Sequence, residues 1–163
     1  MNIERLHHKF LECNSTIDID SRLITKGSIF FAIKGENYDG NEFALEALRN
    51  GAKIAVIDSE EIRFNKNDNI IKVDNTLKTL QNLATFHRES MSCKIVAITG
   101  SNGKTTSKEL IHSVLSISYQ TTSTVGNLNN HIGVPLSLLR IKEDTEFSII
   151  ELGANNFGEI DFL

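Results

Sequence analysis

The fold of this chain is decided by the stretch Lys94-Ile95-Val96-Ala97-Ile98-Thr99-Gly100-Ser101-Asn102-Gly103-Lys104-Thr105-Thr106. Its apolar first half predicts a buried β-strand, and a helix is predicted from residue 104 to about residue 117. Gly100 and Gly103 allow a tight turn between the two, because glycine adopts left-handed backbone conformations at little cost. A strand, a glycine turn and a helix start in this order are the context in which a phosphate-binding loop forms.

The loop matches the short pattern G-x-x-G-K-[S/T], since Ile98 stands where the longer P-loop pattern has a glycine. We expect its backbone N–H groups and the helix dipole to bind the polyphosphate of ATP. Lys104 is expected to reach the outer phosphates, and the Thr105 hydroxyl to bind Mg²⁺. The alternative is an ordinary strand-to-helix turn with a chance lysine. The predicted ATP-binding residues are Gly100, Ser101, Asn102, Gly103, Lys104, Thr105 and Thr106.

A second predicted strand, residues 147–152, has Glu151 near its carboxyl end. Ligands of open α/β sheets bind beyond the carboxyl ends of the strands, so Glu151 is predicted to lie beside the loop. A carboxylate there binds magnesium directly or through water, which makes Thr105 and Glu151 the candidate metal ligands and Lys104 and Glu151 the candidate catalytic residues. The alternative is an exposed glutamate at a strand end.

Residues 126–135 hold three asparagines and a histidine between glycines, followed by Pro135. Two interpretations of this segment stay open. It is either a polar binding loop or a turn-rich connection to a helix that opens at Pro135.

The rest of the chain alternates predicted strands and helices. A short opening helix is expected at residues 3–13, and a helix running to about residue 90 closes the first part. Alternation of this kind predicts an α/β protein with mainly parallel sheets, in two units of residues 1–90 and 91–163. The second unit offers few strands for a complete sheet, so we expect it to be incomplete. Between these two helices, strands are predicted at 29–33, 53–57 and 70–73, and a further helix at 41–50.

Composition narrows the classes of function. The net charge is −4 with interspersed signs, so no basic face for nucleic acid is expected. No stretch reaches the roughly 18 apolar residues of a membrane span, so no membrane insertion is expected. Cys13 and Cys93 have no CxxC spacing, which argues against a zinc site or a disulfide framework and fits a reducing cytoplasm.

Ordered motifs run along nearly the whole chain: Asp20-Ser21-Arg22, Gly27 to Gly35, Asp39 to Phe43, Gly51-Ala52, the loop at 99–106, the segments 126–130 and 132–136, and Glu151-Leu152-Gly153. Together they resemble the Mur ligases of peptidoglycan synthesis. The resemblance implies a small N-terminal α/β substrate domain, residues 1–90, that binds a UDP-sugar, followed by the start of a P-loop parallel-sheet ATPase domain, residues 91–163. Asn41 stands where the family usually has a histidine, and His131 where a glutamate is frequent.

The resemblance also implies a reaction. ATP phosphorylates the terminal carboxylate of UDP-MurNAc-tripeptide to an acyl phosphate, and the amine of D-alanyl-D-alanine then displaces phosphate. The asparagine-rich segment favours this member of the family over the ligase that adds the third residue of the peptide. The implied cofactors are ATP and Mg²⁺, the implied state is a monomer, and the implied substrate-binding residues are Ser21, Arg22, Asn129 and Asn130.

Alternatives to this interpretation remain. From the residues alone, Ser21 and Arg22 fit a capped turn before a strand as well as a ligand site. The loop alone fits another P-loop phosphotransferase, and the first unit alone fits a non-catalytic nucleotide-sugar-binding module. Because the later domains of the family lie outside these 163 residues, the chain by itself is expected to be inactive.

Overall fold

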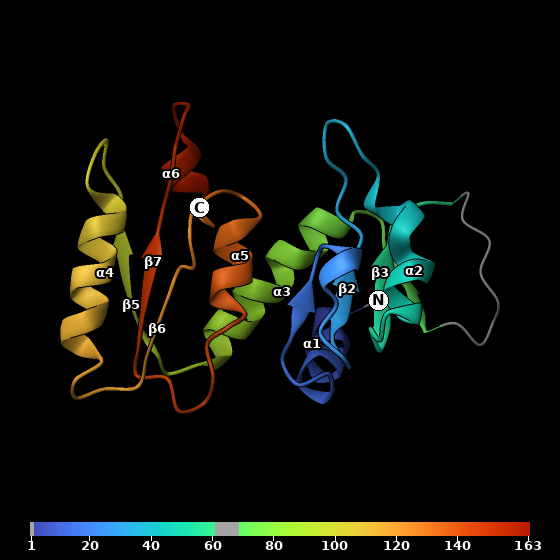
Figure 1. The fold of residues 1–163 in the computed structure, drawn as a ribbon, viewed down its shortest axis with the longest axis horizontal. Helices are drawn as coiled ribbons and strands as arrows, with labels where there is room; N and C mark the ends of the chain where they lie inside the picture. Colours follow the sequence, from blue (N-terminus) through green and yellow to red (C-terminus); the bar gives the residue numbers. More distant parts are fainter. Residues whose placement is uncertain (1, 61–68) are drawn as a thin grey trace. The chain divides into compact units, whose positions relative to one another are not determined.

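A computed structural model describes residues 2–60 and 69–163 of the chain. The chain divides into two compact units, Met1–Leu83 and Ala84–Leu163, and each has its own parallel sheet (Figure 1). The predicted α/β fold with parallel sheets is confirmed. The division lies inside a long helix, and the separate roles predicted for residues 1–90 and 91–163 stay predictions.

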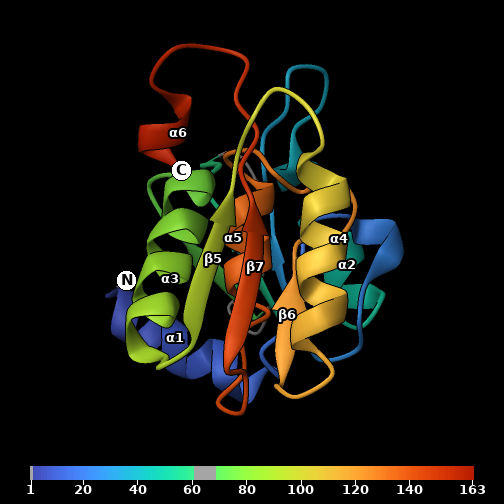
Figure 2. The ribbon, with the colours of Figure 1, turned by 90° about the vertical axis from the view of Figure 1, so that its left-hand side faces the viewer.

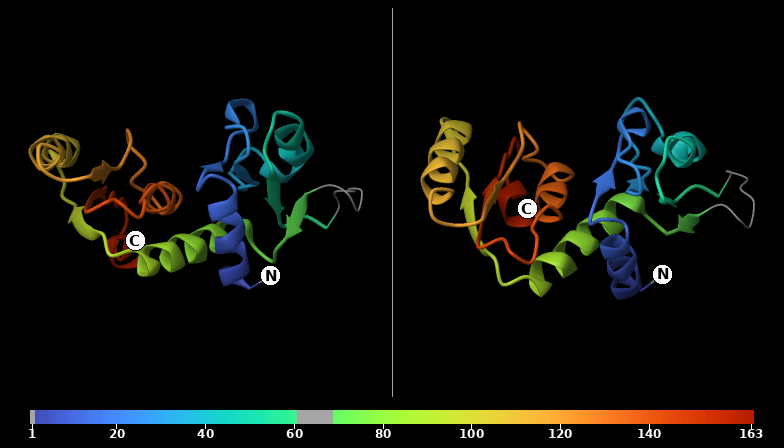
Figure 3. Two further views of the ribbon diagram at one scale, coloured as in Figure 1. Left: turned by 90° about the horizontal axis from the view of Figure 1, so that it is seen from below. Right: turned by 60° about the horizontal axis from the view of Figure 1, so that its bottom comes forward.

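The first unit contains a four-stranded sheet in the order β1-β2-β3-β4, with every neighbouring pair parallel. Strands β2 and β3 are buried along their whole length, as strands covered on both faces must be. Figure 3 shows α2 on one face of this sheet and α1 on the other. The elements are α1 (Ile3–Glu12), β1 (Ile17–Asp18), the 3-10 helix η1 (Ser21–Leu23), β2 (Ile29–Phe31), the 3-10 helix η2 (Gly40–Phe43), α2 (Ala44–Arg49), β3 (Ile54–Ile57), β4 (Ile70–Lys72) and α3 (Thr76–Ser90).

A buried polar network lies at the carboxyl end of β3. The Asn41 side chain is 1% exposed and donates to Asp39 Oδ1 at 2.6 Å and to Asp58 Oδ1 at 2.8 Å. Its oxygen accepts from the backbone N–H groups of Asp58 at 2.9 Å and Ser59 at 3.2 Å. The amide thus has partners for both its donors and its acceptor, as a buried amide requires. Asn41, one of the two departures from the implied family pattern, therefore has a structural role.

The second unit contains a three-stranded parallel sheet in the order β5-β7-β6. Helices α4 and α5 lie on opposite faces of it (Figure 2). None of the helices in the described part of the chain has the length and apolarity that crossing a membrane requires. The elements are β5 (Lys94–Ile98), α4 (Lys104–Leu115), β6 (Thr121–Ser123), α5 (Gly133–Leu138), β7 (Phe147–Glu151) and α6 (Glu159–Phe162).

Strand β5 differs from its prediction as a buried strand. Val96 is half-buried and Ala97 is exposed. Among the described residues β5 pairs only with β7, so it is an edge strand with one side open. Strand β7 has a neighbour on each side, and Ser148 to Glu151 are buried.

Candidate functional site

The loop between β5 and α4 has the backbone that its sequence predicts. Gly100 has φ 145° and Gly103 has φ 73°, both in the region that favours glycine. Gly103 directly precedes the twelve-residue helix α4, whose first N–H groups and positive dipole end open onto the loop. Residues 100–103 are exposed. A polyphosphate therefore has access to a helix start of suitable polarity.

Lys104 is folded back over its own loop. Its Nζ donates to the carbonyl oxygen of Gly100 at 2.7 Å. A phosphate oxygen is a stronger acceptor for an ammonium group than a neutral carbonyl, because the bond is then charged at both ends. Lys104 can therefore exchange Gly100 for a phosphate by rotating its side chain.

The strand order brings Glu151 to the loop. Because β7 lies between β5 and β6, its carboxyl end reaches both the start of α4 and the segment after β6. Thr105 Oγ1 donates to Glu151 Oε2 at 3.0 Å, and Asn129 Nδ2 donates to Glu151 Oε1 at 2.9 Å. Glu151 is 2% exposed, and its backbone N–H donates to Thr124 Oγ1 at 2.9 Å. Each carboxylate oxygen has a donor, as burial of a charged group requires.

The oxygens of Thr105 and Glu151 fit a magnesium ion. Magnesium binds octahedrally at 2.0–2.1 Å, which places neighbouring ligand oxygens about 3 Å apart. Thr105 Oγ1 and Glu151 Oε2 are 3.0 Å apart, and the hydroxyl proton can rotate away from a bound cation. In residues 2–60 and 69–163, no group of three or more His, Cys, Asp or Glu side chains could hold a metal. Magnesium does not need one, because it usually takes one or two carboxylates together with water and substrate phosphates.

The two asparagines predicted to bind substrate lie in different surroundings. Asn129 contacts Glu151, and Gly153 makes room for it, since a Cβ at Gly153 would come within 2.8 Å of Asn129 Cγ. Asn130 Oδ1 instead accepts from the N–H groups of Ile132 at 3.1 Å and Gly133 at 2.9 Å, at the start of α5. Residues 126–135 thus contain both a side chain that contacts Glu151 and the turn that leads into α5. Substrate binding by either asparagine stays a prediction.

Lys108 also belongs to this cluster, although its sequence context does not predict it. Its side chain is 0% exposed, and its Nζ donates to the carbonyl oxygen of Thr124 at 2.7 Å. Nζ also lies 3.0 Å from Glu109 Oε1 and 4.0 Å from Glu151 Oε2. A lysine in a helix is usually exposed, so burial was not expected. The only signal in the sequence is its position one turn after Lys104, on the same side of the helix.

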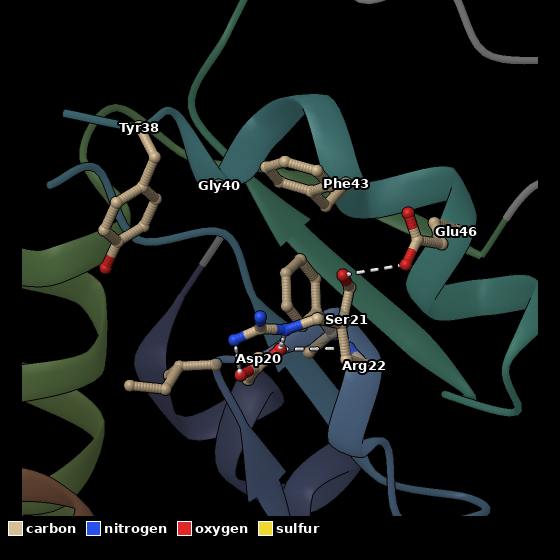
Figure 4. A pocket seen from close by; sticks show the side chains of 9 residues that line it. Asp20, Ser21, Arg22, Tyr38, Gly40, Phe43 and Glu46 are labelled. Atoms are coloured by element: carbon tan, nitrogen blue, oxygen red, sulfur yellow. Dashed lines mark hydrogen bonds and ion pairs between the residues drawn. The ribbon is translucent and has the colours of Figure 1, made fainter.

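The first unit contains a cavity of about 560 Å³ beside η1 (Figure 4), a size typical of small-molecule sites. Ser21 and Arg22, the other predicted substrate-binding residues, both line it. Apolar, aromatic and charged groups are combined in its wall. The lining residues are Ile19, Asp20, Ser21, Arg22, Phe30, Tyr38, Gly40, Phe43 and Glu46.

Charged groups of the cavity are paired with one another. Asp20 accepts from Arg22 Nε at 2.8 Å and Nη2 at 2.6 Å, and the Arg22 side-chain bonds hold the pKa of Asp20 at about 2. The Arg22 side chain is 81% exposed, so it can turn towards a ligand without losing burial. Ser21 Oγ donates to Glu46 Oε1 at 3.1 Å. The capped turn that was the alternative for Ser21 and Arg22 is also present, because Asp20 accepts from the Arg22 backbone N–H at 3.0 Å at the start of η1.

Comparison with known proteins gives two family matches, one for each part of the chain. The model described as "Mur ligase family, catalytic domain" matches residues 15–88, and the one described as "Mur ligase middle domain" matches residues 98–163. The UDP-N-acetylmuramoyl-tripeptide–D-alanyl-D-alanine ligase of Bacillus subtilis is 40% identical over 144 residues, which are 88% of this chain and 32% of the relative. The chain thus spans about a third of the length of such relatives.

Solved structures agree with these matches. A crystal structure of MurF from Acinetobacter baumannii superposes with a TM-score of 0.79 at 39% identity, over 90% of this chain and 32% of that one. MurF from Thermotoga maritima, in complex with ADP, has a TM-score of 0.74 at 35% identity, over 88% of this chain and 33% of that one. The two family models together cover most of the chain, in the order in which the sequence motifs occur. The chain therefore belongs to the Mur ligase family.

Proposed function

We propose that this chain is the UDP-sugar-binding and ATP-binding portion of an ATP-dependent ligase that adds D-alanyl-D-alanine to UDP-MurNAc-tripeptide. The observation that carries the proposal is the pair of Thr105 and Glu151 oxygens, 3.0 Å apart at the start of the helix that follows the glycine loop. Relatives named for this reaction support it at 40% identity, and so does the relative that was crystallised with ADP.

In the second unit, each group has a separate task in binding Mg-ATP. The loop N–H groups and the start of α4 bind phosphate oxygens. Lys104 leaves the Gly100 carbonyl and pairs with the outer phosphates. Thr105 and Glu151 would hold Mg²⁺, which would supply positive charge next to the phosphoryl group that is transferred. Asn129 keeps Glu151 in place through its second oxygen.

In the first unit, the cavity offers contacts for the uridine diphosphate end of the substrate. Tyr38 and Phe43 supply ring faces for a flat base. Glu46 accepts a hydrogen bond from Ser21 and can accept others from ligand hydroxyl or N–H groups. The guanidinium of Arg22 fits a pair of phosphate oxygens, in exchange for Asp20.

The proposed reaction has two steps. A carboxylate oxygen of the tripeptide attacks the γ-phosphorus of ATP, and ADP leaves. The amine nitrogen of D-alanyl-D-alanine then attacks the acyl carbon, phosphate leaves, and the nitrogen loses a proton to form the amide. We expect the reaction to take place in the cytoplasm, because the free cysteines Cys13 and Cys93 fit a reducing compartment. Because the chain spans about a third of its relatives, we expect binding but no turnover from these 163 residues alone.

Calorimetric titration of the chain tests the proposal. We expect it to bind both UDP-MurNAc-tripeptide and a non-hydrolysable ATP analogue, the latter more tightly with Mg²⁺ than without. Glu151→Gln should remove most of the gain from Mg²⁺ and leave the metal-free affinity unchanged. Ser107→Ala, an exposed residue of the first turn of α4, is the matched control.

The other interpretations give different results in the same titration. Binding of Mg-ATP without UDP-MurNAc-tripeptide would indicate another P-loop phosphotransferase. Binding of UDP-MurNAc-tripeptide without ATP would indicate a nucleotide-sugar-binding module. Either result contradicts the proposed ligase.

A further inference from the structure

Lys108 is a buried charged side chain without a task in the reaction proposed above. Its 0% exposure means that its ammonium group has lost its water, which is costly unless protein groups replace that water. The group has three N–H donors. One is taken by the Thr124 carbonyl at 2.7 Å and one by Glu109 Oε1 at 3.0 Å. The third faces Gly126 O at 3.5 Å and Glu151 Oε2 at 4.0 Å.

A purely apolar role does not explain this burial. A methionine has a similar length and would fill the same space without desolvating a charge, and replacements of buried ion pairs by apolar residues are often neutral or stabilising. The position therefore needs an ammonium donor. The hydrogen-bond partners of the Lys108 ammonium group indicate its role.

The strongest contact of Lys108 is with Thr124, which is itself bound to β7. Thr124 N–H donates to the Ile149 carbonyl at 3.0 Å, and Thr124 Oγ1 accepts from the backbone N–H of Glu151 at 2.9 Å. Lys108 thus joins α4, the residue after β6 and the last residue of β7. The segment that follows Thr124 carries Asn129, whose side chain reaches Glu151 Oε1.

Two effects of Lys108 on the Glu151 site oppose each other. As an anchor of Thr124 it holds the backbone on which Glu151 and Asn129 depend, which favours metal binding. As a cation 4.0 Å from Glu151 Oε2 it repels Mg²⁺, which disfavours metal binding. The first effect acts through a direct hydrogen bond of 2.7 Å, whereas the second acts over a longer distance and is partly cancelled by the Glu109 carboxylate. We therefore expect the anchor to dominate.

We propose that Lys108 is a positioning residue for the magnesium site. It fixes the Thr124–Gly126 backbone against α4 and so holds Glu151 at ligand distance from Thr105. This inference rests on the proposed function, because Lys108 would support the residues that are proposed to bind Mg²⁺ without binding the ion itself. Removing a group that hydrogen-bonds to metal ligands, or otherwise positions them, typically lowers metal affinity by 10–100-fold.

The test uses the chain with Lys108→Met, which keeps the length and removes the ammonium group. Calorimetry with a non-hydrolysable ATP analogue should show that the affinity gain from Mg²⁺ falls by about tenfold or more, while the metal-free affinity stays the same. Ser107→Ala, an exposed position next to Lys108 on α4, is the matched control and should keep the full gain from Mg²⁺. An unchanged or larger gain from Mg²⁺ in Lys108→Met overturns the proposal.

A second measurement does not depend on nucleotide binding. Amide hydrogen exchange in residues 124–129 should be faster in Lys108→Met than in the parent chain, with β5 unchanged. If the parent chain shows no Mg-ATP binding, the proposed function fails, and this exchange result still shows whether Lys108 anchors the segment. If Lys108→Met does not fold, Lys108→Gln takes its place. Failure of both variants to fold would mean that the unit needs Lys108 to fold, and the positioning role would be wrong.

Discussion

Asp58 joins the end of β3 to the start of α3. Its Oδ2 accepts from the backbone N–H of Thr76 at 2.9 Å and from the Thr76 hydroxyl at 3.0 Å, and its Oδ1 accepts from Asn41. Burial by itself raises the pKa of Asp58, but the hydrogen bonds from Thr76 and Asn41 outweigh burial and lower the pKa below its ordinary value. The ionised carboxylate therefore stabilises the folded first unit.

The contribution of Asp58 should depend on pH. A carboxyl whose pKa is lowered by folding contributes fully above its unfolded pKa of about 3.9, and the contribution is lost as pH falls through the lower folded value. We expect Asp58→Asn to lower the free energy of unfolding at pH 7 by about 1–3 kcal/mol and to flatten its dependence on pH below about 4. Urea unfolding followed by circular dichroism at a series of pH values measures both.

The exposed Asp74, in the connection between β4 and α3, provides the control. Asp74→Asn should leave the unfolding curves nearly unchanged. Equal pH dependence in Asp58→Asn and the parent chain would contradict the assignment. Some dependence will remain in either case, because Asp20 has a pKa of about 2 in the folded chain.

The residues of the candidate site differ in how far sequence predicts them. The glycine-loop pattern predicts the positions of Lys104 and Thr105, and the end of a predicted strand gives that of Glu151. The sequence therefore predicts that these three residues lie close together. Lys108 and Glu46 could not, because their surroundings come from elements distant in sequence: Lys108 meets the residue after β6, and Glu46 meets Ser21. A helix pattern alone shows such residues as ordinary surface charges.

The start of α5 depends on a close approach between two pieces of backbone. A Cβ on Gly133 would overlap the Cα and carbonyl carbon of Leu128. Backbone cannot move aside as a flexible side chain can, so only glycine fits there without displacement. This contact also sets the position of Asn129, which follows Leu128 directly.

Gly133→Ala should therefore affect both stability and the site. We expect the second unit to lose about 1–3 kcal/mol, the usual cost of forcing extra volume into a packed position, and the Mg²⁺-dependent affinity for nucleotide to fall. Hydrogen exchange of backbone amides in the second unit measures the loss of stability, and calorimetry measures the nucleotide affinity. Gly126→Ala is the comparison: its φ is 55° and nothing lies within 4 Å of an added Cβ, so it should lose about 1 kcal/mol from backbone strain alone. Equal losses in the two variants would exclude the Leu128 contact as the cause.

Elements with a strong local signal were predicted, and elements held by their neighbours were not. The apolar runs of β3 and β7 predict strands, and the glycine loop predicts the start of α4. Strand β6 has the polar sequence Thr121-Thr122-Ser123, and what holds it is pairing with β7 and a hydrogen bond from Thr122 to Ser148 at 2.9 Å. The exposure of β5 also depends on its neighbours, because it reflects an edge position rather than composition.

For the molecule as a whole, the two candidate sites lie in different units. All residues that line the cavity belong to Met1–Leu83, whereas the loop and Glu151 belong to Ala84–Leu163. Each unit has its own sheet, so a substitution at one site leaves the other site's contacts in place. The two binding reactions of this chain should therefore be independent.

Two variants test this independence by calorimetry. Arg22→Ala should weaken binding of UDP-MurNAc-tripeptide by roughly tenfold, the worth of a hydrogen bond to a charged group, and leave Mg-ATP binding unchanged. Lys104→Ala should do the reverse. In the double variant, the binding free energy of each ligand should change by the same amount as in the single variant, within about 0.5 kcal/mol. A change of sugar-nucleotide affinity in Lys104→Ala would show that the sites are coupled.

The strand order of the second sheet also has a consequence for synthesis. In the part of the chain that the structure describes, β5 and β6 pair only with β7, and β7 is the last of the three along the chain. Until residues 147–151 have left the ribosome, no two strands of this sheet can pair. The first sheet, by contrast, has the same order in space as in the chain, so it can grow strand by strand as it emerges. During translation, the cavity is thus expected to form before the two oxygens that would hold the metal come together.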